Sequence, residues 1–455
     1  MGRVSVKKND DVTLTVTGMT AEGAGVGRVD GMAVFVPAAA PGDTVAAHIV
    51  KVTASYAVGK LTQVLTPSPD RVEVDCPAFG RCGGCVWRHI SFEAEGRLKA
   101  ARIEDCLRRI GGLDVTLSGF EQGAPAAYRN KAQYPVAQGE NGGLRFGFFA
   151  PRSHRLVEAA DCRLQPPAFE AALAAVNDYA RAVGLTAYDE TTGKGLLRHV
   201  YLRRSAESGR LMVCLVLNGA ALPAPERLIA ALKDTLGDRL ETLLINVNTA
   251  DTNVVLSPDC RTLYGDGRLR DRLAGVEVAL SPLSFYQVNH EMTDRLYAHG
   301  AALAGEGELL LDLYCGAGTI GLSMASRFAR VIGVEVVPAA VEDARANAAR
   351  NGIGTAEFLF ADAAEAAARL EGEGTRPDVV IVDPPRKGLS PDLPALIADK
   401  MAPARIVYVS CDPATLARDL AAFAAHGYAV KEARGFNLFP RTAHVETVAL
   451  LTRTL

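Results

Sequence analysis

The sequence predicts a multidomain protein with a small N-terminal β-barrel, a central α+β domain and a C-terminal α/β domain. Short alternating strands separated by glycine and proline turns run from Val12 to about Val64. The middle of the chain mixes strand and helix patterns around a cysteine cluster, and strand and helix patterns alternate regularly in the last third. We expect the domains to span residues 1–66, 67–275 and 276–455.

The composition is that of a globular protein, with 49% hydrophobic and 22% charged residues. No apolar stretch follows the N-terminal MGRVSVKKNDD, so a secretory signal is not expected. The longest uncharged run begins at Leu211 and contains Asn218, and it is shorter than the roughly 20 apolar residues of a membrane span. A cytoplasmic protein without a membrane segment is therefore expected.

The predicted barrel contains the strand patterns VTLTV, GMAVFV, DTVAAHIV and VGKLTQVL. The segments GAGVGR and APGD supply the turns, and TPSPD, from Thr66 to Asp70, is the predicted linker. The central region contains one amphipathic helix pattern, EAEGRLKAARIEDCLRRIGG, and strands such as RHVYLRRS and RLMVCLVLN. These patterns predict an α+β domain without fixing its topology.

Nine cysteines in a chain of this length do not suggest the disulfide framework of a small secreted domain. Cys76, Cys82 and Cys85 follow the spacing C-x5-C-x2-C, which indicates zinc or an iron–sulfur centre. Cys106 and Cys162 are both candidates for the fourth ligand. The spacing is not the C-x3-C-x2-C of radical enzymes, so a closed structural centre is expected.

The last third contains the strand patterns LLLDLY, RVIGVE, AEFLFAD, DVVIVD and RIVYVS, each followed by a helix pattern. Repeated βα units predict a mostly parallel, doubly wound sheet. Pro338 near the start of one helix and Gly352 at its end fit the usual asymmetry of helix termini.

A glycine loop after the first of these strands predicts a nucleotide site. Gly316, Gly318 and Gly321 form G-x-G-x-x-G, and Glu335 closes the next strand, where a carboxylate can accept both ribose hydroxyl hydrogens. This motif alone also fits a dinucleotide dehydrogenase. Asp312 extends it to D-x-x-x-G-x-G, which is the usual loop of S-adenosylmethionine enzymes.

Asp362 ends the third strand, where its carboxylate could meet the adenine amine of that ligand. Each acid taken singly could equally be an ordinary strand-end or helix-cap residue. Their common position favours function, because Asp312, Glu335, Asp362, Asp383 and Cys411 all lie at the carboxyl ends of successive predicted strands. Ligands of open α/β sheets bind in that crevice, so we expect these five side chains to face one cleft.

Two of these residues suggest the chemistry. Asp383 opens DPPRKG, which is similar to the (N/D)PP(Y/F) loop of many methyltransferases, although Arg386 replaces the aromatic residue of the amine-methylating enzymes. Cys411, in YVSCDP, precedes a helix that begins near Pro413, and a helix N-terminus favours a thiolate. A buried structural cysteine is the alternative, but proximity to the predicted methyl donor favours a nucleophile.

Five blocks carry a resemblance to a known family: FYQVNHEMTDRLY, LDLYCGAGTIGL, VDPPRKG, YVSCDPATLARDL and FPRTAHVETV. In content and order they resemble the blocks of the RumA/TrmA-type RNA uracil-5-methyltransferases, over nearly the whole chain. The resemblance implies a Rossmann-like methyltransferase domain that methylates uridine C5 from S-adenosylmethionine. Cys411 would add to C6 as the nucleophile and Glu446 would remove the C5 proton.

The remaining site residues also follow from the resemblance. The residues implied to line the methyl-donor and uracil pocket are Gln287, Tyr314, Glu335, Asp362 and Asp383, with Gly316 and Thr319 nearby. Cys162 would complete the cysteine set as the fourth ligand of a 4Fe-4S cluster. The barrel resembles a TRAM domain, an OB-like module that binds RNA. Two positions depart from the family pattern: Arg88, where glutamine is expected, and Asn437, where aspartate is expected.

The implied partner is RNA whose target base is flipped or splayed out, which costs about a few kcal/mol. Phe285 is a candidate for stacking on a base, and Arg129 and Lys131 are candidates for phosphate contacts. Weaker candidates are the basic clusters Arg102, Arg108 and Arg109, and Lys194, Arg198, Arg203 and Arg204.

Family members with both the barrel and the cysteine motif more often act on large-subunit rRNA, so we expect 23S rRNA in preference to the T loop of tRNA. A monomer is expected. The alternatives are a radical thiomethylating enzyme, an amine methyltransferase and a noncatalytic RNA-binding protein with a degenerate methyltransferase domain. The cysteine spacing, the pair of Cys411 and Glu446, and the intact candidate residues speak against them in turn.

Overall fold

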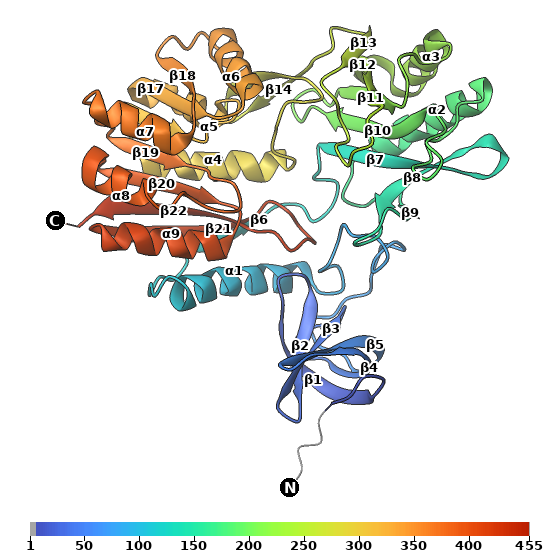
Figure 1. Cartoon of the computed structure of the whole chain (residues 1–455), viewed down its shortest axis with the longest axis horizontal. Coiled ribbons are helices and arrows are strands. Elements are labelled where there is room, and N and C mark those ends of the chain that lie inside the picture. Colours follow the sequence, from blue (N-terminus) through green and yellow to red (C-terminus); the bar gives the residue numbers. More distant parts are fainter. Residues whose placement is uncertain (1–5, 455) are drawn as a thin grey trace. The chain divides into compact units, whose positions relative to one another are not determined.

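The computed structural model describes residues 6–454 (Figure 1). Residues 1–5 and residue 455 lie outside the described residues. Residues 1–5 belong to the predicted barrel domain and to the N-terminal segment in which no secretory signal is expected. The chain divides into two compact units, the first comprising Met1–Ala101, Phe148–Val157 and Phe439–His444, and the second comprising the remainder. The predicted domain limits at residues 66 and 275 stay a prediction.

The first unit contains a closed barrel with the strand order β1-β2-β3-β5-β4 (Figure 1). Its strands are β1 (Asp11–Met19), β2 (Ala24–Val29), β3 (Met32–Pro37), β4 (Thr44–Val52) and β5 (Tyr56–Thr66). Alternate residues such as Leu14 and Val16, or Val34 and Val36, point inward and form the barrel core. Gly27 is required by close packing, because a Cβ there would lie 2.4 Å from the carbonyl oxygen of Thr15. The predicted N-terminal barrel is confirmed.

A second cluster of the first unit surrounds the buried Trp87, which packs with Ile90, Ala94 and Ala40. Ala94 lies on α1 (Phe92–Arg109), whose residues after Ala101 belong to the second unit. On the same helix, Glu95 and Lys99 are fully buried and form an ion pair of 2.8 Å.

The second unit contains an eight-stranded sheet with the order β18-β17-β16-β19-β20-β22-β21-β6. Its strands are β6 (Gly119–Gln122), β16 (Gly307–Leu313), β17 (Phe328–Glu335), β18 (Ala356–Phe360), β19 (Val379–Val382), β20 (Arg405–Ser410), β21 (Tyr428–Asn437) and β22 (Glu446–Arg453). Strands β16 to β20 are parallel, whereas β22 runs antiparallel to β20 and β21. The strand order reverses between β16 and β19, where ligands of such sheets bind. The predicted doubly wound sheet is confirmed.

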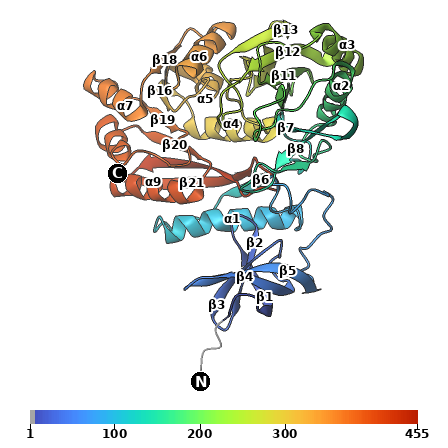
Figure 2. The same ribbon diagram turned by 45° about the vertical axis from the view of Figure 1, so that its right-hand side comes forward.

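Helices cover this sheet (Figures 1 and 2). They are α4 (His290–Ala304), α5 (Thr319–Ser323), η3 (Ala325–Arg327), α6 (Pro338–Arg350), α7 (Ala363–Gly372), α8 (Leu393–Ala395), the π-helix η4 (Leu396–Met401) and α9 (Pro413–Ala425). The central strands are hydrophobic throughout because both faces are covered, and Leu311, Ile332 and Val380 are fully buried.

A second large sheet has seven strands in the order β13-β12-β11-β10-β7-β8-β9 (Figure 2). Its strands are β7 (Lys131–Gln138), β8 (Leu144–Phe149), β9 (Leu156–Glu158), β10 (Leu197–Arg204), β11 (Leu211–Leu217), β12 (Leu240–Val247) and β13 (Cys260–Tyr264). The accompanying helices are η1 (Glu140–Gly142), α2 (Pro167–Val183), α3 (Pro225–Leu236) and η2 (Gly237–Arg239). The run that begins at Leu211 is the fully buried strand β11, and no helix of the described residues is long and apolar enough to cross a membrane.

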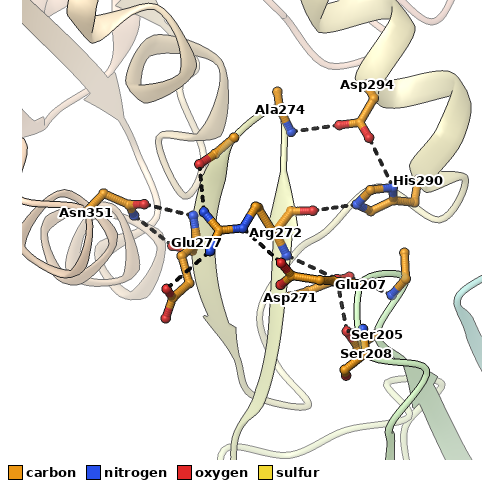
Figure 3. Close-up of polar contacts among 12 residues, drawn as sticks. Ser205, Glu207, Ser208, Asp271, Arg272, Ala274, Glu277, His290, Asp294 and Asn351 are labelled. Carbon is orange, nitrogen blue, oxygen red and sulfur yellow. Dashed lines mark hydrogen bonds and ion pairs between the residues drawn. The ribbon is translucent and has the colours of Figure 1, made fainter.

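A hairpin of β14 (Leu269–Leu273) and β15 (Val276–Leu280) precedes the segment that carries Gln287. Figure 3 shows how polar contacts fix this hairpin. The backbone N–H of Ala274 donates to Asp294 on α4 at 2.7 Å, and the N–H of Glu277 donates to Asn351, just after α6, at 2.9 Å. The hairpin thereby fixes the start of the following segment.

Candidate active site

The carboxyl edge of the parallel strands gathers the predicted side chains. Asp312 is the penultimate residue of β16, Glu335 ends β17, and Asp362 follows β18 by two residues. Asp383 and Cys411 directly follow β19 and β20. The prediction that these five residues lie at the carboxyl ends of successive strands is confirmed.

The glycine loop turns sharply between β16 and α5. Tyr314, Gly316 and Gly318 all have positive φ angles, of 67°, 55° and 77°. A Cβ at Gly318 would also lie 2.9 Å from the ring of Phe358 on β18. Thr319 is the first residue of α5. The loop therefore adopts a conformation that glycine permits and most other residues do not.

Glu335 is held by the backbone of this loop. Its Oε2 accepts a hydrogen bond from the N–H of Gly316 at 3.0 Å, and its Oε1 accepts from the N–H groups of Val336 and Val337 at 2.8 and 2.9 Å. A carboxylate offers about four acceptor positions. These bonds therefore orient Glu335 and leave capacity for the hydroxyl groups of a ligand.

Asp312 lies below the loop and is fully buried. Its Oδ2 accepts from the N–H of Gly321 at 2.9 Å, whereas its Oδ1 has no hydrogen-bond partner among the described residues. Burial, with the neighbouring charges of Asp383 and Glu335, raises the pKa of Asp312 to about 7. A buried acid with an unsatisfied oxygen is characteristic of a ligand site.

Asp362 is the N-cap of α7. Its Oδ1 accepts from the backbone N–H groups of Ala364 and Glu365 at 2.9 and 3.4 Å. The helix-cap interpretation that the sequence allowed is thus correct for one oxygen of this side chain. A role toward adenine requires the other oxygen and stays a proposal.

Cys411 and Glu446 come together through strand pairing. Ser410 is opposite Thr447 in the antiparallel pair of β20 and β22, so Cys411, which follows Ser410, is level with Glu446, which precedes Thr447. Glu446 is 5% exposed. Its pKa is raised well above the usual range by burial and by Asp383, and Arg386 opposes this effect.

The environment of Cys411 differs from the sequence-based expectation. Burial, Glu446 and Asp383 together raise the pKa of the Cys411 thiol to about 11. Asp412 caps α9 by accepting from the N–H groups of Ala414 and Thr415, so those donors are already used. Burial and the two acids therefore outweigh any effect of the helix N-terminus on the pKa of this thiol. Asp383 itself is raised by burial to a pKa of about 7.

Tyr297 on α4 belongs to the site, although the sequence analysis assigned it no role. It is almost fully buried, and its hydroxyl lies 3.3 Å from Oγ1 of Thr319 at the start of α5. Burial raises its pKa, and the carboxylates of Asp383, Asp312 and Glu446 add to the effect. The sequence signal that could have identified Tyr297 is its position at the end of the block FYQVNHEMTDRLY, seven residues after His290.

The other side of Tyr297 faces a cavity of about 630 Å³. Figure 3 shows part of its lining, in which His290 lies between the carbonyl oxygen of Arg272 and the carboxylate of Asp294, at 2.5 and 3.2 Å. These polar groups satisfy one another. The cavity is consequently a poor candidate for the predicted chemistry, which lies on the carboxylate side of Tyr297.

The segment before α4 presents Phe285 and Gln287. Phe285 is 70% exposed, and Gln287 is partly buried. The side-chain amide of Asn130 donates to the carbonyl oxygen of Gln287 at 2.8 Å. Asn289 caps α4 and donates to the carbonyl oxygen of Leu438 at 3.0 Å. Phe285 is therefore available for stacking on a ligand.

Three of the four predicted metal ligands lie in the first unit. Burial raises the pKa of the thiols of Cys82 and Cys85, and the neighbouring Cys76 contributes to both shifts. The N–H of Gly84 points at Sγ of Cys82 at 3.3 Å. Arg88, which departs from the family pattern, contacts Cys85 and pairs with Asp75 at 2.6 Å.

Cys162 belongs to the second unit and is partly buried. Within residues 6–454, no group of three or more His, Cys, Asp or Glu side chains has the geometry to hold a metal ion. All nine cysteines are free of disulfide bonds. The iron–sulfur site therefore stays a prediction.

Two members of the predicted basic clusters are structural. Arg198 is buried and donates to the carbonyl oxygens of Asn248 and Ala250, both at 2.8 Å. Arg203 is 1% exposed. The prediction that these two side chains form an accessible basic surface is wrong, because their guanidinium groups bind backbone carbonyls inside the protein.

Comparisons with known proteins agree with this geometry. Residues 280–454 match a family model described as tRNA (uracil-5-)-methyltransferase, and residues 6–62 match a TRAM domain. An uncharacterized RNA methyltransferase of Halalkalibacterium halodurans is 40% identical over 450 residues, which cover 98% of each chain. One of Clostridium tetani is 38% identical, over 99% of this chain and 98% of the relative.

A solved structure is also similar to the whole chain. The tRNA (uracil-54, C5)-methyltransferase of Pyrococcus abyssi, in complex with S-adenosyl-L-homocysteine, aligns with a TM-score of 0.79 and 26% identity. The alignment covers 97% of this chain and all of the other. The similarity thus extends from the barrel through the sheet that carries the acids and Cys411.

Proposed function

We propose that this chain, which belongs to the S-adenosylmethionine-dependent RNA uracil-5-methyltransferase family, methylates C5 of a uridine through a covalent adduct on Cys411. The observation that carries the proposal is the pairing of Ser410 with Thr447, which sets a thiol and a buried carboxyl group side by side. A nucleophile and a base in one cleft are what C5 methylation requires.

The chemistry explains why both groups are needed. Uracil C5 is a weak nucleophile, and addition of the Cys411 sulfur to C6 moves the π electrons of the C5–C6 bond toward C5 and O4. C5 then forms a bond to the methyl group. S-adenosylmethionine supplies that group from a sulfonium. Glu446 takes the remaining C5 proton, the C5–C6 double bond re-forms, and the C6–S bond breaks to release Cys411.

The raised pKa values suggest which groups accept the protons of the Cys411 thiol and of uracil C5. Cys411 must lose its proton to attack, and Asp383, with a pKa of about 7, is a nearby acceptor. Glu446 must be ionised when it removes the C5 proton. A sulfonium charge in the cleft would lower the pKa of both acids, as Arg386 does for Glu446, because an opposite charge favours the ionised form.

For the methyl donor, we propose binding by the residues around the glycine loop. These residues are Gln287, Tyr314, Gly316, Thr319, Glu335, Asp362 and Asp383, and the geometry adds Asp312 and Tyr297. Asp312 offers an unsatisfied oxygen, and Tyr297 fixes the side chain of Thr319.

A 4Fe-4S cluster held by Cys76, Cys82, Cys85 and Cys162 is part of this proposal. The donor set fits, because four thiols are the usual ligands of such a cluster and the three in the first unit influence one another electrostatically. The N–H of Gly84 and the guanidinium of Arg88 would stabilise thiolate ligands. The cluster would have a structural function.

For the RNA substrate we propose 23S rRNA, because the chain combines a TRAM barrel with the cysteine motif. The second candidate is the T loop of tRNA, which is favoured by the similarity to the tRNA (uracil-54, C5)-methyltransferase of P. abyssi. We further propose that the protein acts as a monomer in the cytoplasm.

The test is methyl transfer from labelled S-adenosylmethionine to unmodified 23S rRNA and, separately, to unmodified tRNA, with the product mapped by mass spectrometry. We expect 5-methyluridine in 23S rRNA with the wild type. Cys411→Ala should reduce the rate at least about a thousandfold, because it removes the nucleophile. Glu446→Gln should instead accumulate a covalent protein–RNA complex that survives denaturing electrophoresis.

The matched control is Cys260→Ser, which changes a partly buried cysteine of β13 that lies outside the site. It should retain wild-type activity. Product in tRNA alone would keep the mechanism and change the substrate. Full activity of Cys411→Ala would contradict the covalent mechanism, and a folded wild type that methylates neither RNA would favour a noncatalytic RNA-binding protein.

A further inference from the structure

Three cations gather where β7 begins, and we call Arg129, Lys131 and Arg203 the cationic cluster. Lys131 on β7 is directly opposite Arg203 on β10 in the antiparallel register, so their side chains share a face. Arg129 precedes Lys131 by two residues, forms an isolated β-bridge with Asn289, and lies close enough for its charge to lower the pKa of Lys131.

No carboxylate pairs with the cationic cluster within residues 6–454. The two Nη atoms of Arg203 donate to the carbonyl oxygens of Ser281 and Ser284, at 3.2 and 2.9 Å. The Nε atoms of Arg203 and Arg129 are buried without a hydrogen-bond partner. Burial, followed by the charges of Arg203 and Arg129, lowers the pKa of Lys131 to about 8. Unpaired cations in a partly buried site cost free energy unless an anion joins them.

The cationic cluster is attached to the segment that carries Phe285 and Gln287. Asn130, between Arg129 and Lys131, is 6% exposed and binds the backbone of that segment twice, at Gln287 and Val288. Its Oδ1 has no hydrogen-bond partner among the described residues. Arg203 fixes the same segment from the other end, through Ser281 and Ser284. The cations and the exposed ring of Phe285 therefore belong to one rigid structure.

We infer that Arg129 and Lys131 of the cationic cluster bind a backbone phosphate of single-stranded RNA next to the base that stacks on Phe285. This inference rests on the proposed function and specifies how the same site recognises its substrate. Lysine and arginine neutralise phosphates, and aromatic side chains stack on unpaired bases. The side chains of Arg129 and Lys131 are only partly buried, and a guanidinium and an ammonium are both donors for phosphate oxygens. Arg203 holds the segment in place, so Arg129 and Lys131 make the contact.

The carboxylate of S-adenosylmethionine is a weaker match for the cationic cluster. That carboxylate is accompanied by its own ammonium group, whereas Arg129 and Lys131 present two positive charges without a negative one. A phosphodiester chain supplies the anion without an attached cation. The two ligands are distinguished by measuring their binding separately.

The test is binding of fluorescein-labelled oligouridine by fluorescence anisotropy, without a methyl donor, across a range of salt concentrations. Lys131→Gln should weaken binding about tenfold and reduce the slope of log K against log salt by about 1, because one phosphate contact is lost. Lys131→Arg should restore both values. Calorimetry with S-adenosylhomocysteine should give the same affinity for all variants.

The matched control is Lys400→Gln, on η4. This exposed lysine lies near the amino end of β20, at the opposite edge of the sheet from the carboxyl ends. Its substitution should leave binding and slope unchanged. The inference is overturned if Lys131→Gln, folded by circular dichroism, binds oligouridine with wild-type affinity and slope, or if it loses affinity for S-adenosylhomocysteine instead.

Failure of the proposed function is distinguishable from failure of this inference. If oligouridine binding depends on Lys131 but neither RNA is methylated, the cationic cluster stands as an RNA site and the reaction is wrong. If methylation depends on Cys411 while binding is indifferent to Lys131, the reaction stands and the inference is wrong.

Discussion

Two fully buried acids, one in each unit, differ in how their charges are satisfied. In the first unit, the fully buried Asp43 accepts hydrogen bonds from the N–H groups of Ala40 and Ser68 and pairs with Arg71. Although burial opposes them, these contacts lower the pKa of Asp43. In the second unit, the equally buried Asp312 leaves one oxygen unsatisfied, and its pKa is raised to about 7.

This difference separates structural charges from charges that await a ligand. A paired and hydrogen-bonded acid stabilises the fold in which it lies, whereas an unpaired acid lowers stability and persists where function requires it. The same contrast applies to cations. Lys99 is paired with Glu95 in the first unit, whereas Lys131 in the second unit has no acid beside it.

The largest expected effect is on stability, and it follows substitution of the paired acid Asp43. Asp43→Ala leaves Arg71 and two backbone N–H groups without their partner, and should destabilise the first unit by about 3–5 kcal/mol. The protein has one tryptophan, Trp87, which is buried in that unit and reports its unfolding in urea.

The control for this substitution is Asp11→Ala. Asp11 pairs with His48 at 2.9 Å, but its side chain is 80% exposed, so the change in stability should be about 0–1 kcal/mol. Equal effects of the two substitutions would show that burial and pairing do not distinguish structural charges here.

The next effect is a pH dependence of opposite sign in the two units. Burial and the charge of Arg71, opposed by Ala39 and Asp43 and supplemented by Arg441, lower the pKa of His89 from 6.5 to about 4. The unfolded chain then binds more protons, so the stability of the first unit should rise by about 3 kcal/mol from pH 4 to pH 6.5. Urea unfolding followed by Trp87 measures it, and His89→Gln should abolish the trend.

In the second unit the sign is reversed. Burial raises the pKa of Asp312 and Asp383 from 3.8 to about 7, so the folded state binds more protons and stability should fall as the pH rises through this interval. Hydrogen exchange at the amides of β16, corrected for the intrinsic pH dependence, measures this. Asp312→Asn should reduce the fall, and parallel trends in the two units would contradict the assignment.

The fold was largely predictable because its patterns are local. The alternation of strands such as VTLTV predicted the barrel, and the βα repeats predicted the parallel sheet with its acids at the carboxyl edge. The seven-stranded sheet was not predicted, because its order joins β7 to β10 and β11 to β12 across long stretches of sequence. Pairings of that kind leave no periodic signal.

The site was predictable in its members but not in their electrostatics. Cys411 is next to a helix N-terminus, as the sequence indicated, yet burial and the nearby acids Glu446 and Asp383, which lie on or directly after other strands, raise its pKa. Arg203 is in a basic run but is buried against Ser281 and Ser284, which follow 78 and 81 residues later. Burial and long-range neighbours decide these properties, and neither is encoded in a local motif.

The smallest expected effect concerns Asp362, which caps a helix and is also proposed to bind the methyl donor. Asp362→Ala removes the cap of α7 and should destabilise the second unit by about 1 kcal/mol, whereas Asp362→Ser keeps a capping oxygen and should cost a few tenths at most. Both substitutions remove the carboxylate proposed to meet the adenine amine, and each should weaken S-adenosylhomocysteine binding about tenfold. Calorimetry beside urea unfolding separates the two roles. If Asp362→Ser binds the ligand like the wild type, the carboxylate is a helix cap alone and belongs with Asp43 among the structural charges.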